Sequence, residues 1–252
     1  MVRIIMCGCN GKMGHTITGL LKEDNAAKIV AGVDLTGEGP GGYPVFKTIN
    51  ECTEKADVII DFSSPTALSD ILEFAEKNSL GVVLCSTGYS DEQIQIINKA
   101  TERIAILRSA NMSLGVNLLL KLVNEAARVL LTQGYDPEIV ERHHNQKVDA
   151  PSGTALAFAD AVNDAADYEY ENVYDRHAVR EKRNKKEIGI SAVRGGTIVG
   201  EHEILFCGPD EVIEFKHTAY SKALFGKGAV TAAKYLSGKE PGMYSMGDVI
   251  NG

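Results

Sequence analysis

The sequence has little of what marks disulfide-linked, zinc-binding or nucleic-acid-binding proteins. It contains five cysteines, an odd number, and no C-x-x-C pair. We therefore expect neither a disulfide framework nor a thiolate zinc site. Lysine and arginine number 26 against 34 acidic residues, which gives a net charge of −8. An acidic chain lacks the basic surface that a general nucleic-acid binder needs.

A long apolar segment and a basic N-terminal leader are also missing. The first apolar run, residues 2–7, is too short for a signal peptide or a membrane span. Together with the unpaired cysteines, this predicts a reduced, cytoplasmic protein. The chain has 252 residues, 44% of them hydrophobic and 24% charged, which is typical of a soluble globular protein with one or two domains.

In the first half of the chain, short apolar runs alternate with helical patterns. The predicted strands are residues 2–7, 27–34, 58–62, 82–85 and 104–107, and the predicted helices are 11–23, 65–78 and 91–100. Alternation of this kind predicts an α/β fold with a Rossmann-like, doubly wound parallel sheet.

The pattern changes in the second half. A helix (115–131), a strand (137–141) and a helix (154–166) precede three extended runs with short glycine turns, at residues 186–194, 200–207 and 211–219. Consecutive strands with short turns predict an antiparallel meander, and so a second, α+β domain with a mostly antiparallel sheet. We predict a dinucleotide-binding domain at 1–114, to which 222–252 return, and a substrate-binding and oligomerisation domain at 115–221.

A glycine-rich turn follows the first predicted strand. Gly8, Gly11 and Gly14 form G-x-x-G-x-x-G, with Asn10 at the middle glycine position of the usual G-x-G-x-x-G fingerprint. Asp34 ends the second predicted strand, where an acid accepts hydrogen bonds from the adenosine ribose. This arrangement predicts dinucleotide binding. The alternative is a glycine turn needed only for packing.

Two further turns follow predicted strands at the same edge of the sheet. They are Ser-Thr-Gly at residues 86–88 and Ala-Asn-Met at residues 110–112. Turn chemistry alone could account for both. Because ligands of open α/β sheets bind at this edge, we favour a nicotinamide pocket.

Residues 138–155 hold the densest group of reactive side chains. His143, His144 and Lys147 precede a Pro-Ser-Gly-Thr turn that opens a helix. Hydride delivery to a C=C or C=N bond leaves an anion or amine that needs a proton, which a His or Lys can supply. The amides of Ser152, Gly153 and Thr154 at the helix N-terminus predict a carboxylate-binding site.

Each of these features also has a structural explanation. Ser152 could merely cap the helix, and a single histidine is more often structural than catalytic. The His-His pair could ligate a metal, but there is no H-E-x-x-H motif and no third clustered ligand, so no metal is expected. A basic stretch at residues 175–187 is either a solvated loop or a lip that attracts an anionic ligand.

The segment E-I-x-E-x-H-x-x-x-K-x-D-x-P-S-G-T-A at residues 138–155 resembles the signature of the 4-hydroxy-tetrahydrodipicolinate reductase family, also called dihydrodipicolinate reductases. The resemblance extends over nearly the whole chain, including residues 61–63, 86–88, 111–117, 194–202 and 236–239. It implies reduction of a cyclic dicarboxylate with NADH or NADPH in the diaminopimelate branch of lysine synthesis. It also implies a cytoplasmic homotetramer of two-domain subunits, with no nucleic-acid or membrane partner.

The resemblance also implies roles for individual residues. His143 matches the family's proton donor and acceptor, and Lys147 its proton donor. Three residues match the family's substrate contacts: His144, Gly153 and Thr154. We include Ser152 with them because it lies in the same turn. The matching cofactor contacts are Gly8, Cys9, Asn10, Gly11, Lys12, Met13, Asp34, Cys85, Ser86, Thr87, Ser109, Ala110, Asn111 and Met112.

The residue after the ribose-binding acid bears on cofactor choice. Leu35 follows Asp34, where many members of the family carry a basic residue that offsets repulsion of the adenosine 2′-phosphate. We predict that Lys12 is the cation within reach of this phosphate, and that both cofactors are used with a lean towards NADH. Another amino-acid-pathway dehydrogenase and a redox-sensing NAD-binding module are the alternatives. A sensor would not need His143 and Lys147.

Overall fold

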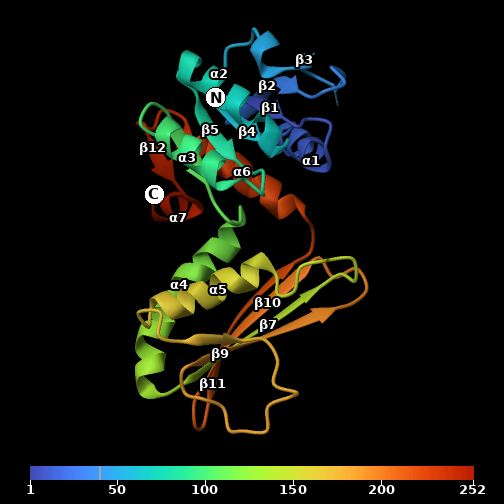
Figure 1. The fold of residues 1–252 in the computed structure, drawn as a ribbon. Helices are drawn as coiled ribbons and strands as arrows, with labels where there is room; N and C mark the ends of the chain where they lie inside the picture. The colour runs from blue at the N-terminus through green and yellow to red at the C-terminus, as the bar shows by residue number, and fades with distance from the viewer. Residues whose placement is uncertain (40) are drawn as a thin grey trace. The chain divides into compact units, whose positions relative to one another are not determined.

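The computed structural model describes residues 1–39 and 41–252 of the chain. The chain divides into two compact units (Figure 1). The first contains Met1–Ser113 and Ala223–Gly252, and the second contains Leu114–Lys222. The polypeptide therefore leaves the first unit once and returns to it once.

The first unit is built on a seven-stranded sheet with the strand order β12-β6-β5-β4-β1-β2-β3. All of its strand pairs are parallel. The strands are β1 (Val2–Cys7), β2 (Ala27–Val33), β3 (Val45–Phe46), β4 (Val58–Asp61), β5 (Gly81–Leu84), β6 (Ala105–Arg108) and β12 (Gly242–Tyr244). From β1 the chain runs outward through β2 and β3, and then in the other direction through β4 to β6. The order reverses between β1 and β4, and ligands bind at such a point.

Helices bury both faces of this sheet, which explains why its strands read as continuous apolar runs. They are α1 (Lys12–Leu21), α2 (Leu68–Asn78), α3 (Asp91–Ala100), α6 (Ala223–Leu236) and α7 (Met246–Asn251), with short 3₁₀ turns η1 (Ile49–Glu51) and η2 (Pro65–Ala67). One core cluster includes Ile17 of α1 and Ala229 of α6, and the other includes Ile71 of α2 and Ile97 of α3. The predicted Rossmann-like fold is confirmed. Both α6 and α7, from the C-terminal end of the chain, belong to the first unit.

The second unit packs helices on a five-stranded sheet with the order β11-β10-β7-β9-β8. Its elements are α4 (Leu114–Leu130), η3 (Leu131–Gln133), β7 (Asp136–His143), α5 (Gly153–Asp164), β8 (Glu171–Val173), β9 (Glu187–Arg194), β10 (Gly200–Cys207) and β11 (Val212–Ala219). The core between helices and sheet contains Ile139, Phe158, Ile204 and Phe206. This is the α+β class that the sequence predicts.

The predicted meander of three consecutive strands is wrong. β10 and β11 form an antiparallel hairpin, but β9 does not pair with β10. The strand β7 lies between them, antiparallel to β10 and parallel to β9. Burial alternates strictly along its eight residues, which suits β7 to the centre of the sheet. The link between β9 and β10 therefore crosses β7.

Three short strands, β3, β8 and β12, were not predicted, because two or three residues carry too little pattern. Among the helices of residues 1–39 and 41–252, none is long and apolar enough to span a membrane.

Candidate active site

The turn between β1 and α1 has room for glycine alone at two positions. Gly8 has a φ of +77°, and a Cβ there would lie 2.7 Å from the carbonyl oxygen of Phe62, which follows β4. A Cβ at Gly14 would lie 2.3 Å from the carbonyl oxygen of Cys9. The amide of Gly8 also donates to the carbonyl of Val33 at 2.9 Å. The turn is thus held tightly across the ends of β2 and β4.

The N-terminus of α1 opens from this turn without a competing side chain. Its N-cap is Gly11, which makes no side-chain capping bond. The Asn10 side chain is turned away and donates to Thr36 Oγ1 at 2.8 Å and to the Glu38 carbonyl. Unpaired amides and the helix dipole favour an anion here, so the turn fits a pyrophosphate.

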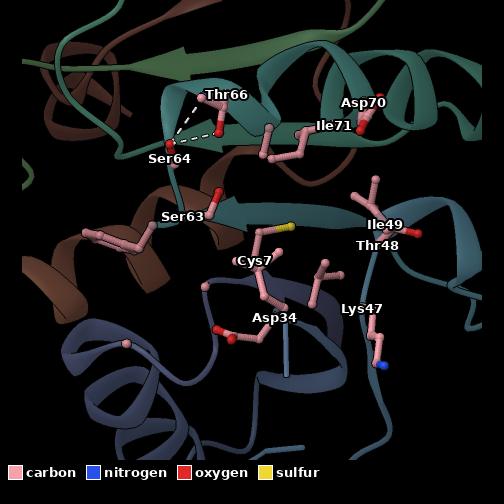
Figure 2. A pocket seen from close by; sticks show the side chains of 16 residues that line it. Cys7, Asp34, Lys47, Thr48, Ile49, Ser63, Ser64, Thr66, Asp70 and Ile71 are labelled. Carbon is pink, nitrogen blue, oxygen red and sulfur yellow. Dashed lines mark hydrogen bonds between the residues drawn. The ribbon is translucent and has the colours of Figure 1, made fainter. Parts of the chain in front are cut away.

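A cavity of about 470 Å³ lies beside the glycine turn (Figure 2). Its lining includes Gly8, Gly11 and Asp34 of the predicted cofactor residues. Figure 2 shows Asp34 and Lys47 on one side of this cavity, and Ser63 and Ser64 on the other. The Asp34 carboxylate accepts a hydrogen bond from the Asn10 amide at 3.1 Å, which fixes it beside the turn.

Lys47 is a basic residue of this cavity that the sequence analysis missed. Val33 of β2 is in register with Phe46 of β3, so Asp34 and Lys47 come next on neighbouring strands. The Asp34 amide also donates to the Phe46 carbonyl at 2.9 Å. The Lys47 stem runs along the loop after Asp34, since a Cβ at Gly37 would lie 3.2 Å from Lys47 Cγ. Lys47 could be placed beside Asp34 only if the two-residue strand β3 and its pairing with β2 were known.

The other side chains of the glycine turn face elsewhere. Cys9 is fully buried, and a Cβ at Gly32 would lie 2.7 Å from its Sγ atom. Burial raises the pKa of the Cys9 thiol to about 11. Met13 points towards α6, where a Cβ at Gly226 would come within 3.4 Å of its Cε. Lys12 is exposed at the start of α1 and is not among the residues that line the cavity.

A buried carboxylate ties together the turns after β4 and β5. Asp61 is fully buried at the end of β4. It accepts hydrogen bonds from the Ser63 amide and from Ser86 Oγ, both at 2.9 Å. Thr87 beside it is exposed, and Cys85 is partly covered. The bond from Ser86 to Asp61 holds the predicted cofactor turn at residues 85–87 against the loop that lines the cavity.

The turn after β6 carries the last predicted cofactor contacts. Asn111 Oδ1 accepts from the Ser113 amide at 2.8 Å, while Met112 is buried in the core. A Cβ at Gly228 of α6 would lie 1.7 Å from the Met112 carbonyl, so α6 rests directly on this backbone. Ser109 is half-buried and Ala110 is exposed at the same sheet edge. The segment is fixed by packing and leaves Ala110 accessible.

In the second unit, Glu141 and His143 occupy alternate positions on the buried face of β7. His143 Nδ1 lies 2.6 Å from Glu141 Oε2. Arg194 at the end of β9 donates to both oxygens of Glu141, at 2.8 and 2.7 Å. Burial opposes ionisation of Glu141, but the bonds from Arg194, His143 and the Ser152 amide outweigh it, so its pKa is lowered. Glu141 is therefore a carboxylate.

Opposing influences act on His143. Burial lowers its pKa most, and the charges of Lys147 and Arg194 lower it further. The hydrogen bond and the negative charge of Glu141 raise it, but the net pKa lies below the ordinary value. The ring is thus neutral near pH 7, with a carboxylate in place to stabilise a proton that arrives.

Ser152 joins this group to helix α5. It is the N-cap residue, and its Oγ accepts from the Ala155 amide at 3.2 Å. Its own amide donates to Glu141 Oε1 at 2.9 Å, and its Oγ lies 3.0 Å from His202 Nε2. Burial lowers the pKa of His202 to about 3, so this ring is neutral and shares a hydrogen bond with the Ser152 hydroxyl. The capping role of Ser152 is real, and it is one of three contacts.

The first turn of α5 lies beside this network. A Cβ at Gly153 would meet no atom within 4 Å, whereas Thr154 is half-buried. Lys147 Nζ pairs with Asp149 Oδ1 at 2.8 Å. That hydrogen bond from Lys147 is the largest cause that lowers the pKa of Asp149, and the Gly153 amide adds a smaller effect. The structure therefore gathers Lys147, Asp149 and the start of α5 in one place.

His144 and the basic stretch at residues 175–187 make contacts outside the Glu141–His143–Ser152 network. His144 is half-buried, and its carbonyl accepts from the Lys147 amide at 3.1 Å. In the basic stretch, Arg183 is largely covered and pairs with Asp136 at 2.9 Å and Glu138 at 3.0 Å. Arg183 thus fastens the stretch to β7.

Known proteins match this chain along its whole length. The family model described as "Dihydrodipicolinate reductase, N-terminus" matches residues 2–112, and the model described as "Dihydrodipicolinate reductase, C-terminus" matches residues 115–250. The chain belongs to the dihydrodipicolinate reductase family. This confirms the resemblance found in the sequence.

Similar members of the family come from several bacteria. The 4-hydroxy-tetrahydrodipicolinate reductase of Caldanaerobacter subterraneus is 50% identical over 99% of this chain and 98% of its own length. That of Clostridium novyi is 45% identical over the same shares. The dipicolinate-bound dihydrodipicolinate reductase of Paenisporosarcina sp. TG-14 superposes with a TM-score of 0.82 at 25% identity and covers 97% of each chain. The fold is thus that of this family from end to end.

The sequence patterns predicted no role for four residues of these networks, which are Glu141, Arg194, His202 and Asp61. One signal was available, because Glu141 and His143 alternate along the strand in step with the apolar Ile139 and therefore share its buried face. Buried polar groups of this kind are hydrogen-bonded, so they point to a network. The partners Arg194 and His202 come from β9 and β10, whose pairing with β7 was not predicted.

Proposed function

We propose that this chain reduces 4-hydroxy-tetrahydrodipicolinate to tetrahydrodipicolinate with NADH or NADPH, in the diaminopimelate branch of lysine synthesis. The observation that carries the proposal is the His143–Glu141 pair beside the N-terminus of α5. It occurs in a chain 50% identical to a reductase of this name. In the reaction, a hydride and a proton are added, and the 4-hydroxyl leaves with one ring hydrogen as water.

The first unit holds the cofactor in this proposal. The glycine turn and the uncapped N-terminus of α1 receive the pyrophosphate, and Asp34 accepts from the adenosine ribose. The turns at residues 85–87 and 109–112 border the nicotinamide. The bound cofactor supplies the hydride. The protein's part is to orient the ring and to provide the proton.

The second unit supplies the proton. His143 has a lowered pKa and a carboxylate partner, so it can accept a proton at one stage and return it at another. Lys147 carries a second proton on its ammonium group, which Asp149 holds beside α5. Elimination of water and protonation of the ring together require both a base and an acid, and these two residues provide them.

Substrate carboxylates bind through charge and backbone amides. The reductase of Paenisporosarcina binds dipicolinate, a cyclic dicarboxylate, which supports a ligand of the same class here. The amides of Gly153 and Thr154 at the N-terminus of α5 receive one carboxylate, with Lys147 beside them. Ser152 fixes this turn, and His144 borders it.

Both cofactors are used, with a lean towards NADH. Asp34 accepts from the ribose hydroxyls of NADH, and its charge repels the 2′-phosphate of NADPH. Lys47 follows the neighbouring strand in register with Asp34 and lines the same cavity. Its ammonium group reduces the repulsion that Leu35 cannot offset, as Lys12 does from the start of α1.

The expected localisation and oligomeric state also follow from membership of the family. We expect a cytoplasmic homotetramer of two-domain subunits, in which residues 115–221 bind substrate and contribute to the interface.

The test is a direct assay of purified protein. NADH absorbance should fall when the cyclic substrate, freshly made, is added, and should stay constant with either component alone. Mass spectrometry should find a product that lacks one oxygen atom relative to the substrate. Oxidation of NADH without that substrate, or a product that keeps the hydroxyl, would contradict the proposal.

A further inference from the structure

The Glu141 carboxylate is saturated with hydrogen-bond donors from three segments of the second unit. Oε2 contacts His143 Nδ1 at 2.6 Å and Arg194 Nη1 at 2.8 Å. Oε1 accepts from Arg194 Nη2 at 2.7 Å and from the Ser152 amide at 2.9 Å. Glu141 is fully buried, so these contacts replace its entire hydration.

This arrangement fixes the tautomer of the neutral His143 ring. A carboxylate only accepts, so His143 Nδ1 must carry the hydrogen and Nε2 must carry the lone pair. Hydrogen bonds to both Glu141 oxygens from Arg194 prevent the carboxylate from rotating away. The reactive nitrogen of His143 is therefore Nε2.

The surroundings of Nε2 agree with this assignment. A Cβ at Gly200, the first residue of β10, would lie 3.0 Å from His143 Nε2. In the described residues 1–39 and 41–252, the hydrogen bond of the His143 ring is the one at Nδ1. The other flank of the ring is closed by His202, whose ring centroid lies 5.2 Å away in an edge-on contact. Glycine at position 200 thus leaves Nε2 free to meet a substrate.

The same carboxylate also fixes the turn that opens α5. The Ser152 amide is held by Glu141, while its hydroxyl bridges the Ala155 amide and His202. One buried group therefore holds both the imidazole and the first residues of the carboxylate-binding turn. A shift of Glu141 would move both together.

We propose that Glu141 is a positioning residue, which holds His143 with Nε2 free and sets its spacing from the N-terminus of α5. The inference rests on the proposed function, since it assigns the proton transfer to His143. Arg194 acts through Glu141 by keeping it ionised and oriented. Neither residue is itself the proton donor.

The charged groups around His143 determine the expected pH dependence. The charged groups are Glu141 on β7, Lys147 in the following loop and Arg194 on β9. The neutral ring of His202 on β10 also packs against His143, and His217 of β11 acts on His202. Glu141 is the one that raises the pKa of His143, whereas Lys147 and Arg194 lower it. Removing the Glu141 charge therefore moves protonation of His143 to lower pH.

The first experiment compares pH profiles of Glu141→Gln, Glu141→Asp and the wild type. If protonated His143 is the acid, kcat falls as pH rises through its pKa. In Glu141→Gln this alkaline limb should move to lower pH, and kcat should fall about 10- to 1,000-fold, a part of the usual contribution of a general acid. Glu141→Asp should restore the position of the limb. A profile of unchanged shape, lowered equally at every pH, would overturn the proposal.

Glu141→Gln leaves Arg194 without its partner and can destabilise the fold. The second measurement therefore uses the wild-type protein. ¹⁵N NMR of the wild-type imidazoles, without substrate, should show neutral His143 protonated on Nδ1. A neutral His143 protonated on Nε2 would overturn the role of Glu141, even in an active reductase. If the proposed function itself were wrong, the NADH assay would show it, and the tautomer of His143 would be unchanged.

Discussion

The two units build their ligand-binding turns from different materials. The turn after β1 is made of backbone, with glycine required by a positive φ at Gly8 and by close contact at Gly14. The turn before α5 is held by side chains, since Glu141 and His202 bond to Ser152 and Arg194 donates to the Asp149 carbonyl. A pyrophosphate needs amides and a helix dipole, whereas proton transfer needs groups whose charge and tautomer are controlled.

This difference decides what each kind of substitution should affect. A change in the first unit should alter cofactor affinity through the shape of the backbone. A change in the second unit should alter proton transfer and leave cofactor affinity intact.

The His143→Gln substitution should have the largest effect on turnover. Loss of a general acid or base lowers rate by about 10²–10⁴. Binding of NADH, measured by fluorescence titration, should not change. The matched control is His177→Gln, because His177 is exposed in a loop and pairs only with Asp175 among the described residues. A His143→Gln protein with wild-type kcat would show that another group moves the proton.

The Gly8→Ala substitution should act on the cofactor. Its Cβ would sit 2.7 Å from the Phe62 carbonyl in a left-handed backbone, so the turn must shift. We expect the Kd for NADH to rise about tenfold or more, a change of about 1.4 kcal/mol. Gly134→Ala is the control, since Gly134 has a φ of +81° but no atom within 4 Å of the added Cβ. Equal NADH affinity in all three proteins would argue against a cofactor site at this turn.

The Lys147→Ala substitution should lower kcat and raise the substrate KM together. A hydrogen bond to a charged group contributes roughly 1.5–3 kcal/mol, so kcat/KM should fall about 10- to 100-fold. Lys186→Ala removes an exposed lysine that pairs with Glu169 and should have no effect. An unchanged KM would limit Lys147 to proton donation and remove it from carboxylate binding.

The smallest effect should come from Lys47→Ala, measured as kcat/KM for each cofactor. Exposed ion pairs contribute roughly 0.2–1 kcal/mol, so turnover with NADPH should fall up to about fivefold, with little change for NADH. Lys12→Ala should act in the same direction, and the larger loss identifies the cation closer to the 2′-phosphate. A wild-type enzyme that prefers NADPH tenfold or more would contradict the role given to Asp34.

Local patterns in the sequence predicted the fold of the glycine turn and its surroundings. Strand, glycine turn, helix and Asp34 follow one another within 34 residues, so spacing alone brings them together. His143 and Lys147 were proposed in the same way, since His143 ends β7 and Lys147 lies in the loop that follows it. Contacts between neighbouring residues and regular periodicity are what a single sequence encodes most directly.

Partners that are distant in sequence could not be predicted. Arg194 reaches Glu141 because β9 pairs with β7, and the sequence suggested that β9 pairs with β10 instead. Lys47 lies beside Asp34 only because two residues form β3. In both cases the register of strand pairing, set by tertiary packing, decides which side chains meet.

The division of roles between the two units is tested most directly by comparing Gly8→Ala with His143→Gln. For each variant, the Kd for NADH and the kcat at saturating NADH are measured. We expect opposite outcomes for the two variants. Gly8→Ala should weaken NADH binding and keep most of its kcat, while His143→Gln should bind NADH normally and lose kcat. If Gly8→Ala lost kcat with normal NADH affinity, or His143→Gln lost NADH affinity with normal kcat, the division of roles would be contradicted.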